Sequence, residues 1–363
     1  FLGLTYSALA GCGTLPLAPS PAPSDEHTPP PSISHELIDA PAAIHVHTEY
    51  SDGHKTIPDI ARIADRQGIK VLYVTDHNTV AGREQHHNRR YGDTLVLVGE
   101  ELTTRNGHLV RLNINSSYPM HQPGIQALRD TAAAGGLGFP SHPQGPHMPW
   151  SAWDTSDITG LELYNLGIDL RFEPIPKLLL GGLFLPTKLF VTQAIDRPSS
   201  LLARWDRLTQ TRRVAAIAGN DAHGHQLTPL LRIAPYDLAL AFVRTHVLLP
   251  EISADAVHEA LAEGRAHIGF DAFGDTAGFT FVLHTNGRVV ANMGERYRTT
   301  DNERIYIWAP RACTIHLIKD GTLIKEAEGH ELHYIVTEPG VYRVECFRNN
   351  RPWIISNPLY LQP

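Results

Sequence analysis

Histidine and carboxylate side chains recur along this chain at spacings that suit metal coordination. The chain has 21 histidines among 363 residues, and histidine is the commonest metal ligand in proteins. His45 and His47 stand two residues apart at the end of one apolar segment. Asp52 lies in the loop after this segment, and later apolar segments are followed by Asp76-His77, Glu100-Glu101, Ser141-His142 and Asp221-Ala222-His223. His108 is the exception, because it stands at the start of an apolar segment. Nitrogen and carboxylate ligands without thiolates are typical of Zn, Mn or Fe sites.

The apolar segments predict the strands that would position these groups. We expect strands at 42–46, 70–74, 95–98, 109–114, 138–140, 160–163, 215–218 and 245–249. Helices are expected at 57–67, 80–90, 122–134, 174–190, 198–211 and 253–263. This alternation predicts parallel βαβ units, in which functional groups collect at the carboxyl ends of the strands. His45 and His47 would then face one side, because alternate residues of a strand share a face.

Composition narrows the class of protein. Hydrophobic residues make up 42% and charged residues 19%, which is typical of a globular chain. The net charge of -7 provides no basic field to favour nucleic acid, so no nucleic-acid partner is expected. No apolar run reaches the roughly 18 residues of a spanning helix. Beyond residue 275 the helical pattern stops, and the turns Asn286-Gly287 and Asp320-Gly321 predict a small β-sandwich over 276–363.

The first residues resemble the end of a bacterial lipoprotein signal. Residues 9–12 read Leu-Ala-Gly-Cys, so residues 1–12 are predicted to end in a lipobox with Cys12 as the lipidated residue. Residues 13–41 are rich in Pro, Ser and Ala and are predicted to be an extended linker. This pattern predicts an exported protein anchored to a membrane by lipid, at the periplasmic face or outer membrane. A chance cysteine in a frayed terminus is the alternative.

Together the motifs resemble the polymerase-and-histidinol-phosphatase (PHP) family of metallohydrolases. The resemblance implies a distorted (β/α)7 barrel over residues 42–275 that holds two or three divalent transition metals, Zn, Mn or Fe. Glu101 would bridge two of the metal positions. The C-terminal region is similar to the carbamate-hydrolase-like (CehA/McbA) branch. The ligands that the resemblance implies are His45, His47, Asp52, His77, Glu101, His108, His142, Asp221 and His223.

This resemblance implies a metal-dependent hydrolase in which a metal-bridging hydroxide, held by Glu101, attacks a small-molecule substrate. Asp221 or His223 would pass a proton to the leaving group, with His77 as a weaker candidate. A phosphoesterase is favoured, because three cations suit the spread charge of a phosphate. A hydrolase of carboxyl esters, carbamates or amides is the alternative, and a non-enzymatic lipoprotein that binds metal or glycan is a second. Arg105 and Lys55 could hold an anion, or they could be solvated loop charges.

Several assignments stay open at the level of sequence. Neighbouring Glu100 and Glu101 cannot both point inward from one strand, and the motif spacing favours Glu101. His108 follows Glu101 by only seven residues, which is close for a second ligand. Cys313 and Cys346 are expected to be buried free thiols rather than a disulfide. The segment 178–190 is either a core helix or a lid. His54, His147 and His225 flank the motifs, whereas His267 is expected to be structural or solvated.

Overall fold

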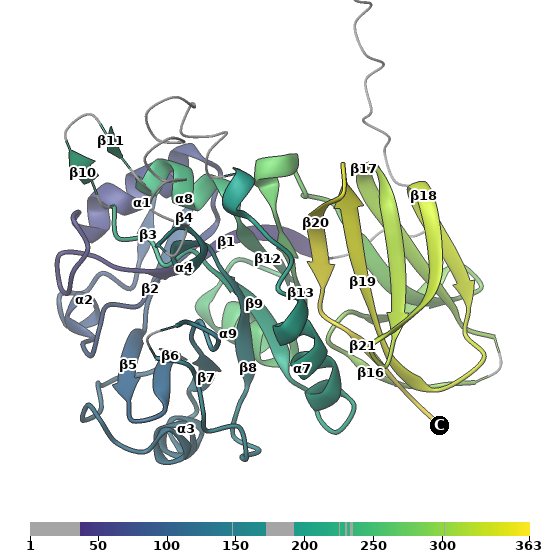
Figure 1. Ribbon diagram of the computed structural model, residues 1–363, viewed down its shortest axis with the longest axis horizontal. Helices are drawn as coiled ribbons and strands as arrows, with labels where there is room; N and C mark the ends of the chain where they lie inside the picture. The colour runs from purple at the N-terminus through teal and green to yellow at the C-terminus, as the bar shows by residue number, and fades with distance from the viewer. Residues whose placement is uncertain are drawn as a thin grey trace, which may run out of the picture.

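The computed structural model describes residues 37–146, 148–171, 192–224, 226–228, 231–232, 235–300 and 302–363. The predicted signal segment with Cys12, the linker up to residue 36 and the predicted helix 174–190 lie outside the described residues, as do His147 and His225. Figure 1 shows an α/β region that carries the N-terminal strands, with a region of long β-strands beside it. In the described part of the chain, no helix combines the length and apolar character needed to cross a membrane.

Three parallel strands form the centre of the α/β region. They are β1 (Ile38–Val46), β2 (Val71–Val74) and β4 (Thr94–Val98), with the short β3 (Arg90–Tyr91) at the edge. Strand β1 begins earlier than predicted, so residues 38–41 of the expected linker lie in the sheet. Their pairing partner is β12 (Arg244–Leu249), a distant segment that the local composition could not reveal.

Helix α1 (Ile57–Arg66) forms the crossover between β1 and β2, as predicted. The Thr56 side chain caps its first turn by accepting a hydrogen bond from the Asp59 N–H. Ile57, Ile60 and two alanines one turn apart are buried on one face, so the helix packs against the sheet. The loop between β1 and α1 carries Asp52, and α1 therefore fixes one end of that loop.

A regular sevenfold barrel is not observed among the described residues. Strands β5 (Glu100–Thr104), β6 (Gly107–Leu112) and β7 (Leu137–Pro140) form an antiparallel sheet, and β8 (Gly160–Asn165) pairs in parallel with β9 (Ala215–Gly219). Strand β12 is antiparallel to both β1 and β13 (Ala266–Gly269). The connection between β5 and β6 is a two-residue turn, which is too short for the dozen or more residues of a parallel crossover.

The remaining helices follow the predicted pattern in part. Helices α3 (Gly124–Ala133), α7 (Ser199–Thr209) and α9 (Ala254–Glu263) match predicted helices, whereas α2 (Ala81–Glu84) is much shorter than expected. Helices α4 (Leu166–Arg171) and α8 (Tyr236–Phe242) were not predicted, because fewer than two full turns give little periodic signal. Strand β10 (Gln226–Thr228) pairs antiparallel with β11 (Leu231–Arg232).

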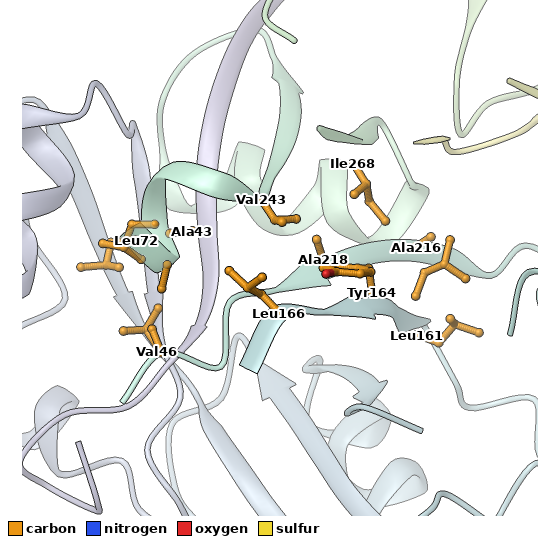
Figure 2. Close-up of a cluster of buried hydrophobic side chains, with 14 of the residues drawn as sticks. Ala43, Val46, Leu72, Leu161, Tyr164, Leu166, Ala216, Ala218, Val243 and Ile268 are labelled. Carbon is orange, nitrogen blue, oxygen red and sulfur yellow. The ribbon is translucent and has the colours of Figure 1, made fainter. Parts of the chain in front are cut away.

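A shared apolar core holds the strand ends of the α/β region together. Figure 2 shows Ala43 and Val46 of β1 near Leu72 of β2, with Leu161, Tyr164, Ala216 and Ala218 of β8 and β9 across from them. All of these side chains are buried. Burying such side chains contributes roughly 25 cal/mol per Å² of apolar surface removed from water. The packing therefore fixes the strand ends at which the polar motifs stand.

The C-terminal region is all β, as predicted, but it does not form a separate sheet. It comprises β14 (Thr280–Thr285), β15 (Arg288–Asn292), β16 (Arg296–Arg298), β17 (Arg304–Lys319), β18 (Thr322–Ile335), β19 (Gly340–Arg348), β20 (Arg351–Ser356) and β21 (Leu359–Gln362). Strand β20 pairs with β13, so one 14-stranded sheet runs through both regions.

Two further predictions about the C-terminal region are confirmed. Both predicted hairpin turns are present, and Asn286 and Asp320 adopt the positive φ that a tight turn before glycine requires. Cys313 and Cys346 are buried free thiols. They belong to a C-terminal hydrophobic cluster that is distinct from the one in Figure 2.

Candidate metal centre

The β5–β6 hairpin brings Glu101 and His108 together. Oε1 of Glu101 lies 3.0 Å from Nδ1 of His108 and 2.9 Å from Nε2 of His142. In the hairpin, His108 stands opposite Thr103, which shares a strand face with Glu101. The short separation in sequence is therefore no obstacle, because β6 runs back beside β5. The Glu101 side chain is only 1% exposed, so the contacts of this oxygen with the two histidines are shielded from bulk water.

Glu100 points to the opposite side of the same strand. Its carboxylate is buried with the Arg111 guanidinium and accepts a hydrogen bond from the Ser117 hydroxyl. Glu101 is therefore the carboxylate that reaches the histidine cluster, whereas Glu100 is neutralised by a cation on the neighbouring strand β6.

The second oxygen of Glu101 meets three more histidines. Oε2 lies 3.2 Å from Nε2 of His45, 3.4 Å from Nε2 of His47 and 3.2 Å from Nδ1 of His77. Oδ1 of Asp221 lies 3.6 Å from Nε2 of His45 and 3.3 Å from Nε2 of His47. One carboxylate is thus shared by five imidazoles, with a second carboxylate beside two of them.

Asp52 gathers a third group at the more open end of the cluster. Its carboxylate lies 3.2 Å from Nε2 of His223, 3.6 Å from Nδ1 of His47 and 3.8 Å from Nε2 of His77. The Asp52 side chain is 49% exposed, which leaves this end open to solvent. The structure therefore brings all nine residues of the expected ligand set into one continuous cluster.

Three residues of the cluster have left-handed backbone conformations. The φ angles are 67° at His45, 29° at His142 and 47° at Asp221. Such angles are uncommon for residues other than glycine. At His45 the pairing of β1 with β2 also shifts register, so a bulge turns the chain there. His45 and His47 do converge, with ring centroids 5.0 Å apart, but through this bulge rather than through regular strand alternation.

Glu162 is a buried residue of the centre that the sequence interpretation missed. Oε1 lies 2.7 Å from Nδ1 of His45, and Oε2 accepts hydrogen bonds from the His142 N–H, the Asn165 amide and the Ser141 hydroxyl. It thereby fixes the His45 ring so that Nε2 faces Glu101, an arrangement found behind many histidine metal ligands. The signal in the sequence that could have identified Glu162 is a single acidic residue inside an otherwise apolar predicted strand.

Two other features position the centre. A Cβ atom at Gly219 would lie 1.5 Å from Oε1 of Glu162, so only glycine fits beside that carboxylate. Asp76 accepts hydrogen bonds from the Thr48 N–H, the Thr48 hydroxyl and the Ser51 hydroxyl. Asp76 thus holds the loop that leads to Asp52.

The electrostatics of the cluster favour bound positive charge. Burial opposes protonation of His45, but the carboxylates of Glu101, Glu162 and Asp221 outweigh it and hold the pKa of His45 well above its usual value. Burial also opposes protonation of His142, yet the hydrogen bond and charge of Glu101 raise its pKa to about 9. Against their own burial, the histidines hold the pKa values of the Glu101 and Asp221 carboxyls well below the usual range.

The unpartnered atoms of the cluster fit divalent metal ions. Nε2 of His45, both ring nitrogens of His47, Nδ1 of His77 and Oε2 of Glu101 are buried without a hydrogen-bond partner. Leaving such atoms unpaired costs about 1–3 kcal/mol each. Imidazole nitrogens and carboxylate oxygens that face one another at these distances are a donor set for Zn, Mn or Fe. Divalent metals are therefore the ligands that this cluster fits.

The two residues predicted to hold an anion are placed elsewhere. Arg105 stands four residues beyond Glu101, but the chain between them is a strand, which carries Arg105 about 13 Å away. Its Nε donates instead to the His121 carbonyl. Lys55 is exposed, and its charge acts on the Asp59 carboxyl of α1. Neither residue is among the described linings of the two cavities at the cluster, which favours the alternative of solvated loop charges.

Two adjoining cavities open onto the cluster. The smaller, of about 140 Å³, is lined by His77, Glu101, His108, His142, Gly145, Pro146, Met148, Ile168, Asp221 and His223. The larger, of about 260 Å³, shares His142, Gly145 and Ile168 with it and extends past Tyr164 and Asn165 to Arg197. Together they leave room for a small molecule whose reacting group would lie beside Glu101 and Asp221.

Comparisons with known proteins give limited guidance. No family model matches the chain. The chain is 29% identical to uncharacterized protein MJ1587 of Methanocaldococcus jannaschii over 140 residues, which span 34% of this chain and 81% of that protein.

Three solved structures are similar at low identity. A two-domain protein from Bacteroides vulgatus containing a predicted PHP-like metal-dependent phosphoesterase is 15% identical with a TM-score of 0.42, over 89% of this chain and 96% of that one. A putative metal-dependent phosphoesterase from Bifidobacterium adolescentis is 14% identical with a TM-score of 0.33, over 53% and 92%. An amidohydrolase from Chromobacterium violaceum is 15% identical with a TM-score of 0.31, over 55% and 95%. TM-scores below 0.5 establish neither a shared fold nor a shared activity.

Proposed function

We propose that this protein is a metal-dependent hydrolase of the PHP type that acts on phosphate esters. The observation that carries the proposal is the position of Glu101, whose carboxylate lies within 3.4 Å of five histidine nitrogens. Metal ions bound on both sides of this carboxylate would supply an activated water as nucleophile and would polarise the bond under attack.

The protein's own residues would orient this chemistry. Glu162 fixes the His45 ring, and Asp76 fixes the loop that carries Asp52. The Nδ1–H of His223 donates to the Asp221 carbonyl, 2.9 Å away, so Nε2 of His223 faces Asp52. Asp221 is ionised at neutral pH because the nearby histidines outweigh its burial and keep its pKa low. Because a metal-bound water would be far more acidic than free water, the Asp221 carboxylate beside it could still take its proton and pass it to the leaving group.

The number of ligand groups supports a phosphate substrate. Groups around Oε1 of Glu101, around Oε2 of Glu101 and around Asp52 adjoin one another, and neighbouring pairs share a residue. Three adjacent cations would match the charge that a phosphate spreads over several oxygens. A third position next to the half-exposed Asp52 would also be the one nearest to an entering substrate.

A hydrolase of carboxyl esters, carbamates or amides is the second candidate. In the described linings of the two cavities, the single arginine or lysine is Arg197. Its Nε and Nη2 atoms both donate to the Glu345 carboxylate. A lining with so little free positive charge would accommodate a neutral carbonyl substrate. The metals themselves would have to balance the charge of a phosphate.

A substrate panel with a matched pair of variants tests the proposal. The purified protein is stripped with a chelator, reloaded with Zn or Mn, and assayed on chromogenic phosphate monoesters, diesters and carboxyl esters. Glu101→Gln should abolish hydrolysis, whereas Glu100→Gln, on the opposite face of the same strand, should retain it. Metal-dependent hydrolysis of carboxyl esters alone would favour the second candidate. Equal activity of Glu101→Gln and the wild type would contradict both.

We further propose that the protein is exported and anchored to a membrane through Cys12. This proposal rests on the Leu-Ala-Gly-Cys pattern of residues 9–12 and on the proline-rich segment that follows it. Such a spacer would hold the hydrolase away from the lipid surface.

A further inference from the structure

A second group of metal-ligating side chains lies outside the Glu101 cluster. It consists of Asp39 on β1, His246 on β12 and His267 on β13, and ligand atoms from the three lie within 4.8 Å of one another. Both histidines are fully buried, and the Asp39 side chain is 19% exposed. The group therefore sits inside the sheet, on the strands that lead to the C-terminal region, with one side open enough for an ion to enter.

His267 is a fully buried side chain whose ring lies near the Thr276 backbone without a hydrogen bond of normal geometry. Both of its ring nitrogens lack a hydrogen-bond partner. Burial and the neighbouring His246 lower its pKa to about 3, so the ring is neutral and offers a lone pair. A buried neutral imidazole with a free lone pair near a carboxylate is a ready metal ligand.

The partners of His246 orient it in the way that a metal ligand requires. Nε2 lies 3.0 Å from the Thr276 hydroxyl, and that hydroxyl donates onward to Oδ1 of Asp271. Nδ1 of His246 lies 2.7 Å from Asp39. If a metal ion replaced the proton on Nδ1, His246 would keep its Nε2 proton for Thr276 and would present the lone pair of Nδ1 to the ion. Metal-bound histidines commonly donate their second nitrogen to such a chain, and the chain fixes the ring.

The geometry resembles part of the Glu101 cluster. There, Asp52 faces His223, whose ring is stacked on His47 with centroids 4.1 Å apart and planes 16° apart. Here, Asp39 faces His246, whose ring is stacked on His267 with centroids 4.6 Å apart and planes 13° apart. Both groups thus present one aspartate to two stacked imidazoles.

We propose that Asp39, His246 and His267 bind a divalent transition metal, with Zn²⁺ as the ion that the donor set fits. The ligands would be the Asp39 carboxylate, Nδ1 of His246 and one nitrogen of His267, with water as the fourth. Tetrahedral Zn²⁺ with bonds of about 2.0–2.1 Å separates its ligand atoms by roughly 3.3 Å. The Asp39–His246 contact would therefore open by about half an ångström, and the His267 ring would tilt toward the ion.

A proton is the competing occupant of the site. Without metal, Asp39 and Asp271 outweigh the burial of His246 and raise its pKa to about 10, while Arg244 neutralises part of the Asp271 charge. The same negative field attracts a divalent ion, which must displace that proton.

A bound ion would join segments that are distant in sequence. Asp39 also accepts a hydrogen bond from the Gly278 N–H through Oδ2, and Gly278 lies two residues before β14. The site would link β1, β12 and β13 to the start of the C-terminal region. Its expected role is to hold the two regions together, independently of the hydrolysis proposed for the Glu101 cluster.

Metal counting with site-specific variants tests the inference. The full chain is loaded with excess Zn²⁺, freed of unbound metal by gel filtration and analysed for zinc per chain. His267→Phe keeps the ring stacking and should lower the count by one, and Asp39→Asn should weaken the same ion. His284→Phe is the matched control, because His284 is also buried with both nitrogens unpartnered, yet it belongs to no group of metal-ligating side chains among the described residues. Its zinc count should equal that of the wild type.

A second background separates this site from the proposed active centre. A variant with His47→Ala, Glu101→Ala and Asp221→Ala should still bind one zinc per chain, and adding His267→Phe should remove that zinc. Should the triple variant fail to fold, the single variants decide the matter through their zinc counts alone. Equal zinc counts in His267→Phe, Asp39→Asn and the wild type would overturn the inference, leaving a protonated His246 paired with Asp39. If the wild type shows no hydrolysis but the zinc counts are as expected, the result would contradict the proposed function and leave this inference intact.

Discussion

Replacing Glu162 with glutamine probes the centre without touching the expected ligands. All four partners of the Glu162 carboxylate are hydrogen-bond donors in the orientation that leaves Nε2 of His45 free. A glutamine has the same shape but only one accepting oxygen. If that oxygen faces His45, the new NH₂ group meets the donors at His142 and Asn165. If the NH₂ group faces His45, the ring must accept at Nδ1 and carry its proton on Nε2, where it can no longer bind metal.

Either orientation weakens metal binding. Loss of a group that orients a histidine ligand typically reduces metal affinity by about 10–100-fold, which corresponds to roughly 1.4–2.8 kcal/mol. We expect Glu162→Gln to fall in this range, and hydrolysis to recover in part when the metal concentration is raised. Glu101→Gln should not recover, because it removes the shared carboxylate itself.

The assay is a chelator competition that measures the affinity for Zn or Mn, with hydrolysis followed as a function of metal concentration. Glu100→Gln is the matched control, since Glu100 is equally buried but pairs with Arg111 on the other face. That variant should lose stability, because breaking a buried ion pair costs about 3–5 kcal/mol, and should keep its metal affinity. A Glu162→Gln protein with wild-type affinity, or the same loss of affinity in both variants, would refute the reasoning.

Four further predictions follow from the structure. The proton that Glu101 holds on His142, with the pKa of His142 at about 9 despite its burial, must leave before metal binds. The apparent metal affinity should therefore rise from pH 7 to 9, and in a chelator titration His142→Gln should make that rise less steep without removing it, because the pKa of His45 is also raised. Because φ at His142 is 29°, His142→Gly should be more stable than His142→Ala by about 1 kcal/mol in denaturant unfolding of the stripped protein, whereas glycine should be the less stable choice at His108, within β6. Unfolded, unreduced protein of residues 42–363, which lacks Cys12, should titrate two thiols from Cys313 and Cys346, and none would indicate a bridge. A fatty-acid analogue should label the wild type in cells and not Cys12→Ser; equal labelling of both would reject the anchor.

The residues of the candidate centre could be predicted from the sequence more completely than the fold that positions them. Polar groups after apolar segments suggested one cluster, and the structure gathers all nine. The predicted strand pairing was partly wrong. Glu100 and Glu101 were expected to follow the end of a strand, but they begin the separate strand β5, whose hairpin with β6 makes His108 a neighbour of Glu101. Pairing between distant segments leaves no local trace in composition. For the same reason Asp39 was assigned to a linker, although it pairs with strand β12, over 200 residues away.

The costly backbone conformations at three candidate ligands favour an ion-binding role for the centre. Left-handed conformations at residues other than glycine cost on the order of 1–3 kcal/mol each, and His45, His142 and Asp221 all adopt them. A domain has only about 5–15 kcal/mol of net stability, so glycine or asparagine would be the less costly choice at these positions. The surrounding hydrogen bonds hold the conformations in place, including those of the His142 N–H with Glu162 and of the Ala222 N–H with the His45 carbonyl. Of the eleven residues other than glycine with positive φ in the described part of the chain, three are candidate ligands of this one cluster. Buried strain at these three positions, held by specific hydrogen bonds, favours a centre built for ion binding over a chance gathering of buried polar residues.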